Sequence, residues 1–363
     1  MADVARVLVY VFIVTLKRSG HRFEVAPGET VLEAAQRAGI ALPYSCRAGA
    51  CGSCKATLLE GRCTYPRNPP AALDAGERAR HAVLLCQAVP ASDLLLEARE
   101  VTSVEDIARR QLDVVVAEKR LLAPEIIGLR LQPAAGEMRL RWLAGQYLDV
   151  LLDENRRRPF SIANEPRADG SIELHVRHVT GGGFTSWVAD GLKVGDTLRV
   201  EGPLGTFVPR EDSERPMLFV AGGTGFAPVR AIVGHFLALG TRRPMAVYWG
   251  ARGAADLYLR GEAEAWTQAA SNVRFQPVLS DPGEARAAGL REGLVHEALL
   301  ADHPDLSGHD VYMSGPPAMI DAARHRFVAA GLPEDRLYYD SFDYAPDVLA
   351  QIMAGRAGIH PAL

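Results

Sequence analysis

Four cysteines with the spacing of a metal-cluster motif constrain the N-terminal part of this chain more than any other feature. Cys46, Cys51 and Cys54 give C-x4-C-x2-C, and Cys86 follows much later. This is the plant-type [2Fe–2S] spacing, in which four thiolates converge on two irons. A zinc site is the alternative, but such sites usually show two paired C-x2-C arms. Here only Cys51 and Cys54 form one. The pattern therefore predicts a binuclear iron–sulfur centre.

The residues between these cysteines suit a loop that wraps a cluster closely. Gly49 and Gly52 let the backbone turn, and backbone N–H groups can then point at the sulfurs and help to set the potential. The chain has five cysteines, an odd number, which argues against a disulfide framework. The remaining one, Cys63, is interpreted as a bystander thiol rather than a ligand.

Composition narrows the class of protein further. A chain of 363 residues, 48% hydrophobic and 23% charged, has room for two or three domains with sizeable cores. A net charge of -4 gives no case for nucleic-acid binding. The most apolar N-terminal run, residues 7–16, is too short to span a bilayer and instead suits a strand. We expect a cytoplasmic protein with reduced thiols and no membrane span.

The first of three blocks, residues 1–103, is expected to be a small α+β domain of the β-grasp type that carries the cysteine loop. Strands are predicted at 11–16 and 22–25, followed by a helix. Thr30 and Glu33 form a capping box at the start of that helix. The apolar residues expected on its buried face are Val31, Leu32, Ala35 and Ala38.

The second block, residues 111–212, has the pattern of an antiparallel β-barrel. Its alternating or β-branched segments are short and are separated by glycine-containing turns. The predicted strands are 112–117, 126–131, 147–152, 172–178 and 197–201. The sequence Gly-Pro-Leu-Gly at 202–205 is interpreted mainly as a turn that closes the barrel.

The third block, residues 213–342, alternates buried strands with helices, which predicts a doubly wound parallel sheet of the α/β class. The continuous apolar segment 217–221 leads through glycines into a helix over 227–239. Further strands are predicted at 245–249, 273–278 and 310–314. Residues 343–363 form a C-terminal tail.

Two motifs in the second block suit a flavin. In the sequence Arg158-Pro159-Phe160-Ser161, between two predicted strands, the arginine can neutralise a pyrophosphate, the aromatic ring can stack on an isoalloxazine, and the serine can hydrogen-bond near flavin N5. A glycine run, residues 181–183, precedes a helix, and Thr185 adds a hydroxyl, which makes an anion seat. Each motif alone is weak, and together within one predicted barrel they predict a flavin site.

The third block carries two candidate nucleotide loops. Gly222 to Pro228 joins a buried strand to a helix, where glycines allow close approach of a pyrophosphate. It is not G-x-G-x-x-G, and no acid ends the next strand, so a variant nucleotide fold is required. The second loop, Ser314 to Met319, follows the last predicted strand, and carboxyl ends of such strands bind ligands.

Taken together, these residues resemble the ferredoxin–NADP reductase superfamily, and most of all the NADH-dependent oxygenase reductases with an N-terminal ferredoxin domain, close to CDP-6-deoxy-glucoseen reductase-like proteins. The resemblance covers about residues 11–342. It includes R-P-F-S, L-H-V-R-H-V with a glycine run, G-P-L-G-T-F, G-T-G-F-A-P, V-L-S-D and S-G-P-P-A-M.

The resemblance implies FAD and a nicotinamide nucleotide as cofactors, with Ser161 and Ser314 nearest the chemistry. The residues expected to bind these two groups are Arg158, Pro159, Phe160, Ser161, His175, Arg177, Gly182, Gly183, Thr185, Gly223, Thr224, Gly225, Asp281, Gly315, Pro316 and Phe342. Ser314 stands where the family usually has a cysteine over the nicotinamide. Asp281 would repel a 2′-phosphate and favours NADH, whereas Arg252 could accept that phosphate; we expect NADH.

The resulting hypothesis is a reductase that moves electrons from NADH through FAD to the [2Fe–2S] cluster and on to a protein partner, an oxygenase or a sugar 3-dehydrase. A flavin suits this task because it joins two-electron to one-electron chemistry. The alternatives are a free-flavin or quinone reductase, and an electron carrier whose nucleotide site is inactive.

Overall fold

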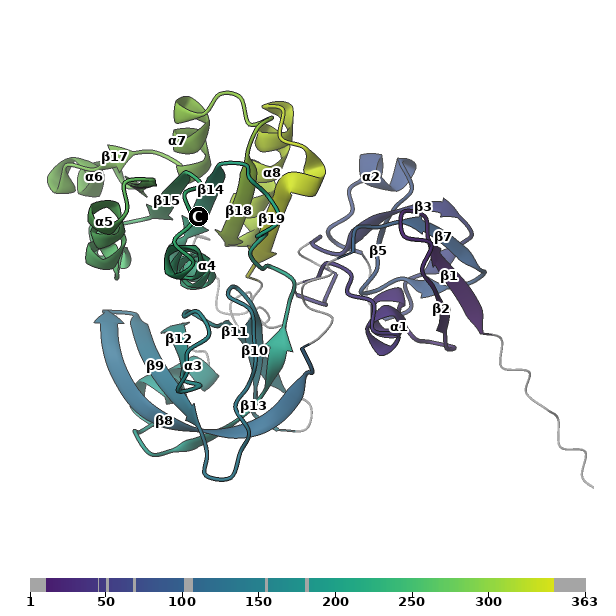
Figure 1. The fold of residues 1–363 in the computed structure, drawn as a ribbon, viewed down its shortest axis with the longest axis horizontal. Helices are drawn as coiled ribbons and strands as arrows, with labels where there is room; N and C mark the ends of the chain where they lie inside the picture. The colour runs from purple at the N-terminus through teal and green to yellow at the C-terminus, as the bar shows by residue number, and fades with distance from the viewer. Residues whose placement is uncertain are drawn as a thin grey trace, which may run out of the picture. The chain divides into compact units, whose positions relative to one another are not determined.

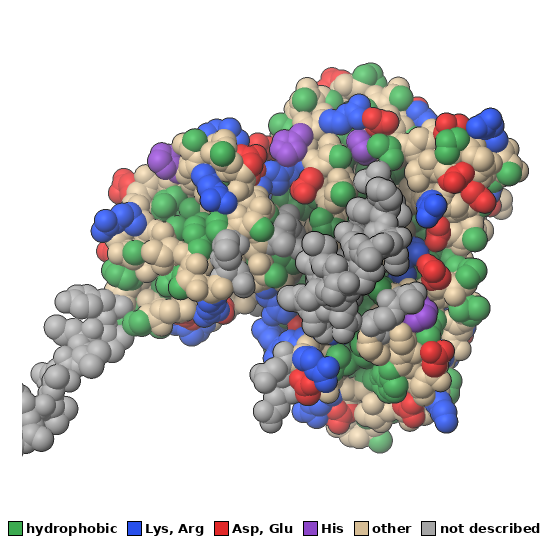
Figure 2. Space-filling view, turned by 180° about the vertical axis from the view of Figure 1, so that it is seen from behind, with side chains coloured by type: hydrophobic (Ala, Val, Ile, Leu, Met, Phe, Trp, Pro, Cys, Tyr) green, Lys and Arg blue, Asp and Glu red, His purple; other side chains and the backbone are tan. Residues whose placement is uncertain are grey.

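The structure is a computed structural model that describes residues 11–44, 46–49, 52–67, 70–100, 107–153, 156–179 and 183–342. The chain divides into two compact units, Met1–Asp106 and Ile107–Leu363. Within the described ranges, no helix has the length and apolar character needed to cross a membrane. On the face shown in Figure 2, acidic and basic side chains are interspersed over the described surface.

The first unit is built on a five-stranded mixed sheet with the strand order β2-β1-β7-β3-β5. Strands β1 and β7 are parallel, and the other neighbours are antiparallel. The strands are β1 (Phe12–Leu16), β2 (Arg22–Val25), β3 (Lys55–Glu60), β5 (Ala82–Leu84) and β7 (Leu94–Glu97), with β4 (Cys63–Thr64) and β6 (Val89–Pro90) as a separate pair and helices α1 (Val31–Arg37) and α2 (Ala75–Ala79). The α1 residues and the sheet share one hydrophobic core.

The capping box predicted for α1 is confirmed. The Thr30 hydroxyl accepts a hydrogen bond from the Glu33 N–H at 3.2 Å, and the Glu33 carboxylate accepts one from the Thr30 N–H at 2.9 Å. The predicted buried face is partly wrong, because Ala34 is buried and Ala38 is exposed. The helix ends at Arg37, which leaves Ala38 at the C-cap, beyond the last buried turn.

The first half of the second unit is the predicted antiparallel barrel. Its sheet has the order β11-β10-β13-β8-β9-β12. The strands are β8 (Arg110–Ala123), β9 (Ile126–Pro133), β10 (Tyr147–Leu151), β11 (Arg157–Ser161), β12 (Ile172–Arg177) and β13 (Thr197–Leu204), and helix α3 (Gly183–Asp190) follows β12. A bridge from Ile162 to Leu174 joins the two outermost strands and closes the sheet (Figure 1).

Two local predictions in the barrel are wrong. The sequence expected between strands, Arg158 to Ser161, lies within β11, and its Pro159 is tolerated because β11 is an outer strand of the sheet order. Residues 202–204, predicted as a turn, belong to β13. The pairing of β10 with β13 shifts register between Tyr147 and Asp149, and a bulge of this kind accommodates a proline inside a strand.

The second half is a six-stranded, all-parallel sheet with the order β17-β16-β15-β14-β18-β19. The strands are β14 (Met217–Gly222), β15 (Met245–Ala251), β16 (Val273–Leu279), β17 (Arg291–Glu292), β18 (Asp310–Gly315) and β19 (Leu337–Ser341), with helices α4 (Phe226–Ala238), α5 (Arg260–Ala269), α6 (Pro282–Ala288), α7 (Val295–Asp302) and α8 (Pro317–Ala329). The strand order reverses direction between β14 and β18, which makes their carboxyl ends a topological switch point.

Each face of this sheet has its own core, as a doubly wound fold requires. Phe219 of β14 packs with α4 and α5 residues, and the adjacent Val220 packs with α7 and α8 residues. The first of these cores also contains Ala144 and Phe207, which lie in segments next to the barrel strands. The barrel and the parallel sheet therefore share packed apolar residues.

Candidate functional site

The predicted cluster ligands lie in two segments of the first unit: the cysteine loop precedes β3, and Cys86 follows β5. Cys54 and Cys86 are both buried, and the Leu85 N–H donates to the Cys54 carbonyl at 3.1 Å. The Ala48 N–H points at the Cys46 sulfur, at 3.4 Å. Cys51, the second predicted ligand, lies outside the described residues. The described segments thus bring three of the four predicted cysteines into one region.

The chemistry of these cysteines fits a thiolate-bound centre. Cys54 lies within hydrogen-bond distance of Cys86 and lowers the pKa of the Cys86 thiol, against the opposing effect of burial. Gly49 and Gly52 have φ values of 81° and 76°, so the loop uses left-handed backbone that favours glycine. In the described ranges, which omit Cys51, no three His, Cys, Asp or Glu side chains are grouped to hold a single metal ion.

Cys63 differs from the other cysteines in its surroundings. It lies on β4, opposite Pro90 of β6. Burial raises the pKa of its thiol, which also hydrogen-bonds with Tyr65. A raised pKa disfavours the thiolate that a metal needs, and this agrees with the interpretation of Cys63 as a bystander.

A pocket of about 460 Å³ lies beside the flavin motif, between β10, β11, β13 and α3. Its lining includes three residues of α3 and three arginines. The guanidinium groups of the arginines share this lining with the exposed indole of Trp187. The lining residues are Val150, Leu151, Leu152, Arg156, Arg158, Gly183, Phe184, Trp187, Thr197, Leu198 and Arg199. A Cβ added at Gly183 would meet nothing within 4 Å, so the N-terminus of α3 is open.

The other flavin residues surround this pocket. Phe160 lies 5.6 Å from Phe184 between ring centroids, and Pro159 is exposed. The Thr185 hydroxyl accepts from the Val179 N–H at 3.1 Å and so fixes the start of α3 to the end of β12. Gly182 lies outside the described residues. Half-exposed side chains on β11 leave room for a planar ring system, and the donor set suits a pyrophosphate.

The two predicted nucleotide loops meet at the switch point of the parallel sheet. A Cβ added at Gly225 would lie 2.0 Å from the Ser314 carbonyl oxygen, and one at Gly222 would lie 2.9 Å from the Pro316 ring. Glycine is therefore required here by close backbone approach between the loops. Gly223 and Thr224 remain partly exposed at the start of α4, where backbone N–H groups suit a phosphate.

Two stacked aromatic side chains contact the first nucleotide loop, which begins at Gly222. The Trp249 indole N–H donates to the Gly223 carbonyl at 3.0 Å. The Trp249 ring is stacked on Phe226, the first residue of α4, with centroids 3.7 Å apart and planes 5° apart. The loop geometry is thus fixed by packing from two consecutive strand–helix units.

Asp340 joins the flavin motif to the nucleotide loops, and sequence reasoning missed it. The Ser161 hydroxyl donates to the Asp340 carboxylate at 3.4 Å. On β19, Asp340 lies in register with Ser314 of β18, and the following Phe342 N–H donates to the Gly315 carbonyl at 3.0 Å. No motif contains Asp340. Only the pairing of β18 with β19 brings it beside Ser161.

Ser314 is completely buried, and its hydroxyl finds no hydrogen-bond partner among the described residues. The same holds for the hydroxyl of the buried Ser341, at the end of β19. Buried hydroxyl groups are usually paired. A ligand bound at the switch point could supply the missing hydrogen-bond partners of these two hydroxyl groups.

Two residues expected to bind cofactors, His175 and Arg177, lie between the barrel and the parallel sheet. The buried His175 Nδ1 lies 3.0 Å from the Tyr258 hydroxyl. Arg177 forms an ion pair with Asp256 at 3.4 Å, and a Cβ added at Gly223 would lie 3.4 Å from the Arg177 guanidinium. Arg177 is therefore close to the first nucleotide loop, whereas His175 is engaged in a contact between the two halves.

Asp281 begins α6 as its N-cap. Its carboxylate accepts hydrogen bonds from the Gly283 and Glu284 N–H groups at 2.9 and 3.0 Å. These bonds, and more weakly the charge of Arg252, lower the pKa of the Asp281 carboxyl. The Asp281 N–H also donates to the Arg252 carbonyl at 3.2 Å. The acid and the base that favour different nucleotides are thus neighbours.

Burial of His175 predicts an acid-sensitive stability. Burial, assisted by the charge of Arg230, lowers the pKa of His175 to about 3. Since the unfolded side chain binds a proton near pH 6.5, stability is full above that pH and falls as the pH is lowered toward 3, by about 2 kcal/mol at pH 5. We expect the melting temperature of His175→Gln to fall less than that of the wild type between pH 7 and pH 5. Parallel curves would contradict this assignment.

Comparison with known proteins agrees with each of the three predicted sites. Residues 14–91 match the family described as 2Fe-2S iron-sulfur cluster binding domain, residues 113–208 the oxidoreductase FAD-binding domain, and residues 219–325 the oxidoreductase NAD-binding domain. Cluster, flavin and nucleotide domains thus follow one another along the chain in the predicted order.

Known proteins are similar to this chain over most of its length. The chain is 37% identical to the CDP-6-deoxy-L-threo-D-glycero-4-hexulose-3-dehydrase reductase of Yersinia pestis, over 91% of this chain and 98% of the relative. It is 36% identical to the reductase component 1 of terephthalate 1,2-dioxygenase from Comamonas, over 89% and 95%. The crystal structure of an Amycolatopsis cytochrome P450 reductase superposes with a TM-score of 0.71 at 35% identity, over 91% of this chain and 98% of that one.

The fold and the three sites define an iron–sulfur flavoprotein reductase, which carries electrons from a nicotinamide nucleotide through FAD to a [2Fe–2S] cluster. The chain belongs to the family of the reductase components of oxygenases and sugar dehydrases. This confirms the predicted class of an iron–sulfur flavoprotein reductase.

Proposed function

We propose that this reductase takes its hydride from NADH and delivers single electrons to a protein partner, either an oxygenase or a sugar dehydrase. One observation carries the proposal: β11, the two nucleotide loops and β19 come together at the carboxyl ends of the strands of the parallel sheet. When bound, FAD accepts the two electrons of a hydride and releases them singly. The protein supplies binding, alignment and the exclusion of water.

The pocket beside β11 would hold the flavin. Arg158 would neutralise the pyrophosphate, while the open start of α3 at Gly183, with Gly182 and Thr185, would donate backbone and hydroxyl hydrogen bonds to it. Phe160 would pack against the isoalloxazine, with Pro159 shaping the strand beside it. Ser161, held by Asp340, would hydrogen-bond near the reacting nitrogen, and Phe342 would cover the ring.

The switch point would hold the nucleotide. Gly223, Thr224 and Gly225 would receive its pyrophosphate at the start of α4, with Arg177 beside them, and the Gly315-Pro316 turn would face the nicotinamide. The unpaired Ser314 hydroxyl would orient the nicotinamide where the family usually places a thiol. We expect Ser314→Cys to change the charge-transfer band or the hydride-transfer rate. Unchanged values for both would refute a positioning role.

NADH is favoured over NADPH by the carboxylate of Asp281. It lies next to Arg252, where its charge offsets the guanidinium that could otherwise accept a 2′-phosphate. We expect kcat/KM to be about tenfold higher for NADH, and Asp281→Asn to narrow the difference. Comparable kcat/KM values for the two nucleotides would overturn this preference.

The partner is proposed from the relatives, which serve an oxygenase or a sugar dehydrase. A cytoplasmic location belongs to the same proposal, because reduced thiols and the nicotinamide pool are both available there. The test is anaerobic reduction by NADH followed by mixing with cytochrome c as a one-electron acceptor. Cytochrome c reduction that depends on the cluster cysteines supports the proposal, and reduction that survives loss of the cluster contradicts it.

A further inference from the structure

One face of β12 connects the barrel to the nucleotide half through three side chains at alternate positions. Glu173, His175 and Arg177 share this face because side chains along a strand alternate between its two sides. Their partners Arg230, Tyr258 and Asp256 all belong to the nucleotide half, after β14. We call this set of six residues the β12 seam.

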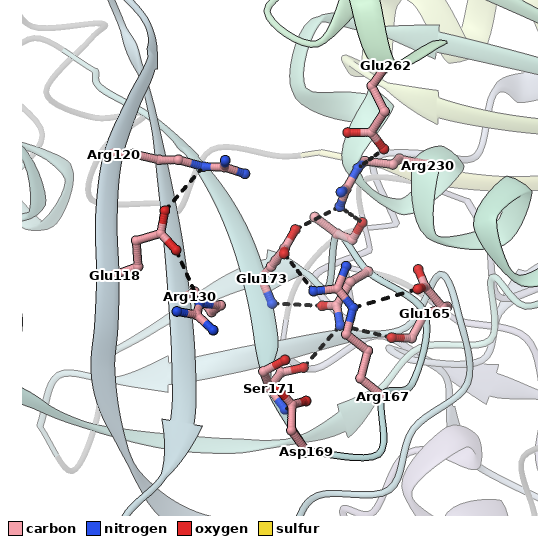
Figure 3. Close-up of polar contacts among 12 residues, drawn as sticks. Glu118, Arg120, Arg130, Glu165, Arg167, Asp169, Ser171, Glu173, Arg230 and Glu262 are labelled. Atoms are coloured by element: carbon pink, nitrogen blue, oxygen red, sulfur yellow. Dashed lines mark hydrogen bonds and ion pairs between the residues drawn. The ribbon is translucent and has the colours of Figure 1, made fainter. Parts of the chain in front are cut away.

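Arg230 of α4 forms the more buried of the two ion pairs of the seam (Figure 3). Its Nη1 lies 2.8 Å from the Glu173 carboxylate, and its Nε lies 2.6 Å from the Glu262 carboxylate of α5. The same Nη1 donates to the Ala163 carbonyl at 2.8 Å. Arg230 and Glu173 are each only 12% exposed. One guanidinium therefore bonds to the barrel at two points and to the nucleotide half at a third.

The contact with Ala163 connects Arg230 to the flavin strand. Ala163 follows Ser161 by two residues, directly after the Ile162 bridge that closes the barrel. Because Arg230 holds both this segment and Glu173 of β12, it fixes the end of β11 with respect to α4.

The contact also reaches the nucleotide loop. Arg230 lies one helical turn after Phe226, the first residue of α4, which is stacked on Trp249. Trp249 in turn donates to the Gly223 carbonyl, and Tyr258 of the seam packs edge-on against Trp249 at 5.1 Å. A shift of Arg230 would therefore be transmitted to the loop through packed rings.

We propose that Arg230 is a positioning residue for hydride transfer, because it sets the separation between the Ser161 end of β11 and the nucleotide loop at Gly223. The inference rests on the proposed flavin and nucleotide sites. The rate of hydride transfer falls steeply with the distance between the reacting atoms, so that a misplacement of about 1 Å can lower the rate on the order of a hundredfold. Arg230 acts through α4 and touches no reacting atom.

The chain offers a matched control for this residue. Arg167 binds the other oxygen of the same Glu173 carboxylate, at 2.9 Å, but lies within the barrel, between β11 and β12. In Arg230→Gln the Glu173 carboxylate keeps Arg167 as its partner, and in Arg167→Gln it keeps Arg230. Neither substitution therefore leaves a buried charge without a counter-charge, which is the costly case.

The experiment compares Arg230→Gln, Arg230→Lys and Arg167→Gln in the FAD-loaded full chain. Anaerobic stopped-flow with saturating NADH and C4-deuterated NADH gives the hydride-transfer rate constant and its isotope effect. We expect Arg230→Gln to slow this step about tenfold, with a full isotope effect on the rate constant and FAD affinity unchanged. Arg230→Lys should recover part of the rate, and Arg167→Gln should stay within about twofold of the wild type.

Hydrogen exchange provides a readout that does not depend on turnover. Without nucleotide, the peptide spanning Gly223 to Arg230 should exchange faster in Arg230→Gln and unchanged in Arg167→Gln. Equal hydride-transfer rates in wild type and Arg230→Gln, or an equal loss in Arg167→Gln, would overturn the inference. Should Arg230→Gln fail to fold, Arg230→Lys must slow the step more than Arg167→Lys, and equal rates overturn it. A wild-type flavin that NADH does not bleach would instead refute the proposed function.

Discussion

Cys86→Ser is expected to remove the visible absorbance of the iron–sulfur centre and to lower cytochrome c reduction by about a hundredfold, while NADH still bleaches the flavin. The reason is that a serine hydroxyl is a much poorer iron ligand than a thiolate, and single electrons leave the protein through the cluster. The measurement combines an absorbance spectrum of the purified protein with anaerobic NADH addition and a cytochrome c assay.

Cys63→Ser is the matched control, since it removes from the same unit the one cysteine outside the cluster motif, which lies on β4. It should keep both the cluster spectrum and the cytochrome c activity. Loss of the spectrum in Cys63→Ser, or its retention in Cys86→Ser, would show that the ligand set is assigned wrongly.

Gly225→Ala is expected to slow flavin reduction by NADH about a hundredfold, with the FAD and cluster spectra retained. The added Cβ would lie 2.0 Å from the Ser314 carbonyl oxygen and 2.8 Å from the Gly315 nitrogen. Both are backbone atoms, so the loops must separate, and a displacement of about 1 Å in a reacting geometry has a cost of this order. Stopped-flow absorbance at the flavin band measures the rate.

Gly261→Ala serves as the control for this substitution. Gly261 lies in α5, and a Cβ there meets nothing within 4 Å. The rate of flavin reduction should be unchanged, and stability should rise by about 0.5–1 kcal/mol because alanine favours helix. Similar reduction rates in Gly225→Ala and Gly261→Ala would mean that contact between the two loops is unimportant for nucleotide reduction.

Features set by local sequence could be predicted well. The capping box at Thr30, the apolar strand that becomes β14, and the glycine loop before α4 each depend on residues a few positions apart. The boundaries of β12, β14 and β18 differ from the predicted ones by a single residue. The cluster site could also be predicted from local sequence, because the ligand residues themselves form the C-x4-C-x2-C motif.

Features set by long-range pairing could not be predicted. Asp340 comes to lie beside Ser161 only because β19 pairs with β18 and the barrel packs against that edge. His175 and Arg177 were expected to bind cofactors, and their contacts with the nucleotide half were not predicted because the partners lie about 80 positions away. The extension of β13 through Pro203 depends on a register shift against β10, which no local pattern reveals.

The central claim is that one polypeptide moves electrons from NADH through a flavin to a binuclear iron–sulfur centre. Anaerobic titration of the FAD-loaded, cluster-containing protein with NADH tests it most directly, followed by absorbance of both centres. Complete bleaching of flavin and cluster at about 1.5 equivalents of NADH is predicted, because the flavin takes two electrons and the cluster one. A flavin that stays oxidised in excess NADH, or a cluster that stays oxidised beside a bleached flavin, would contradict the account.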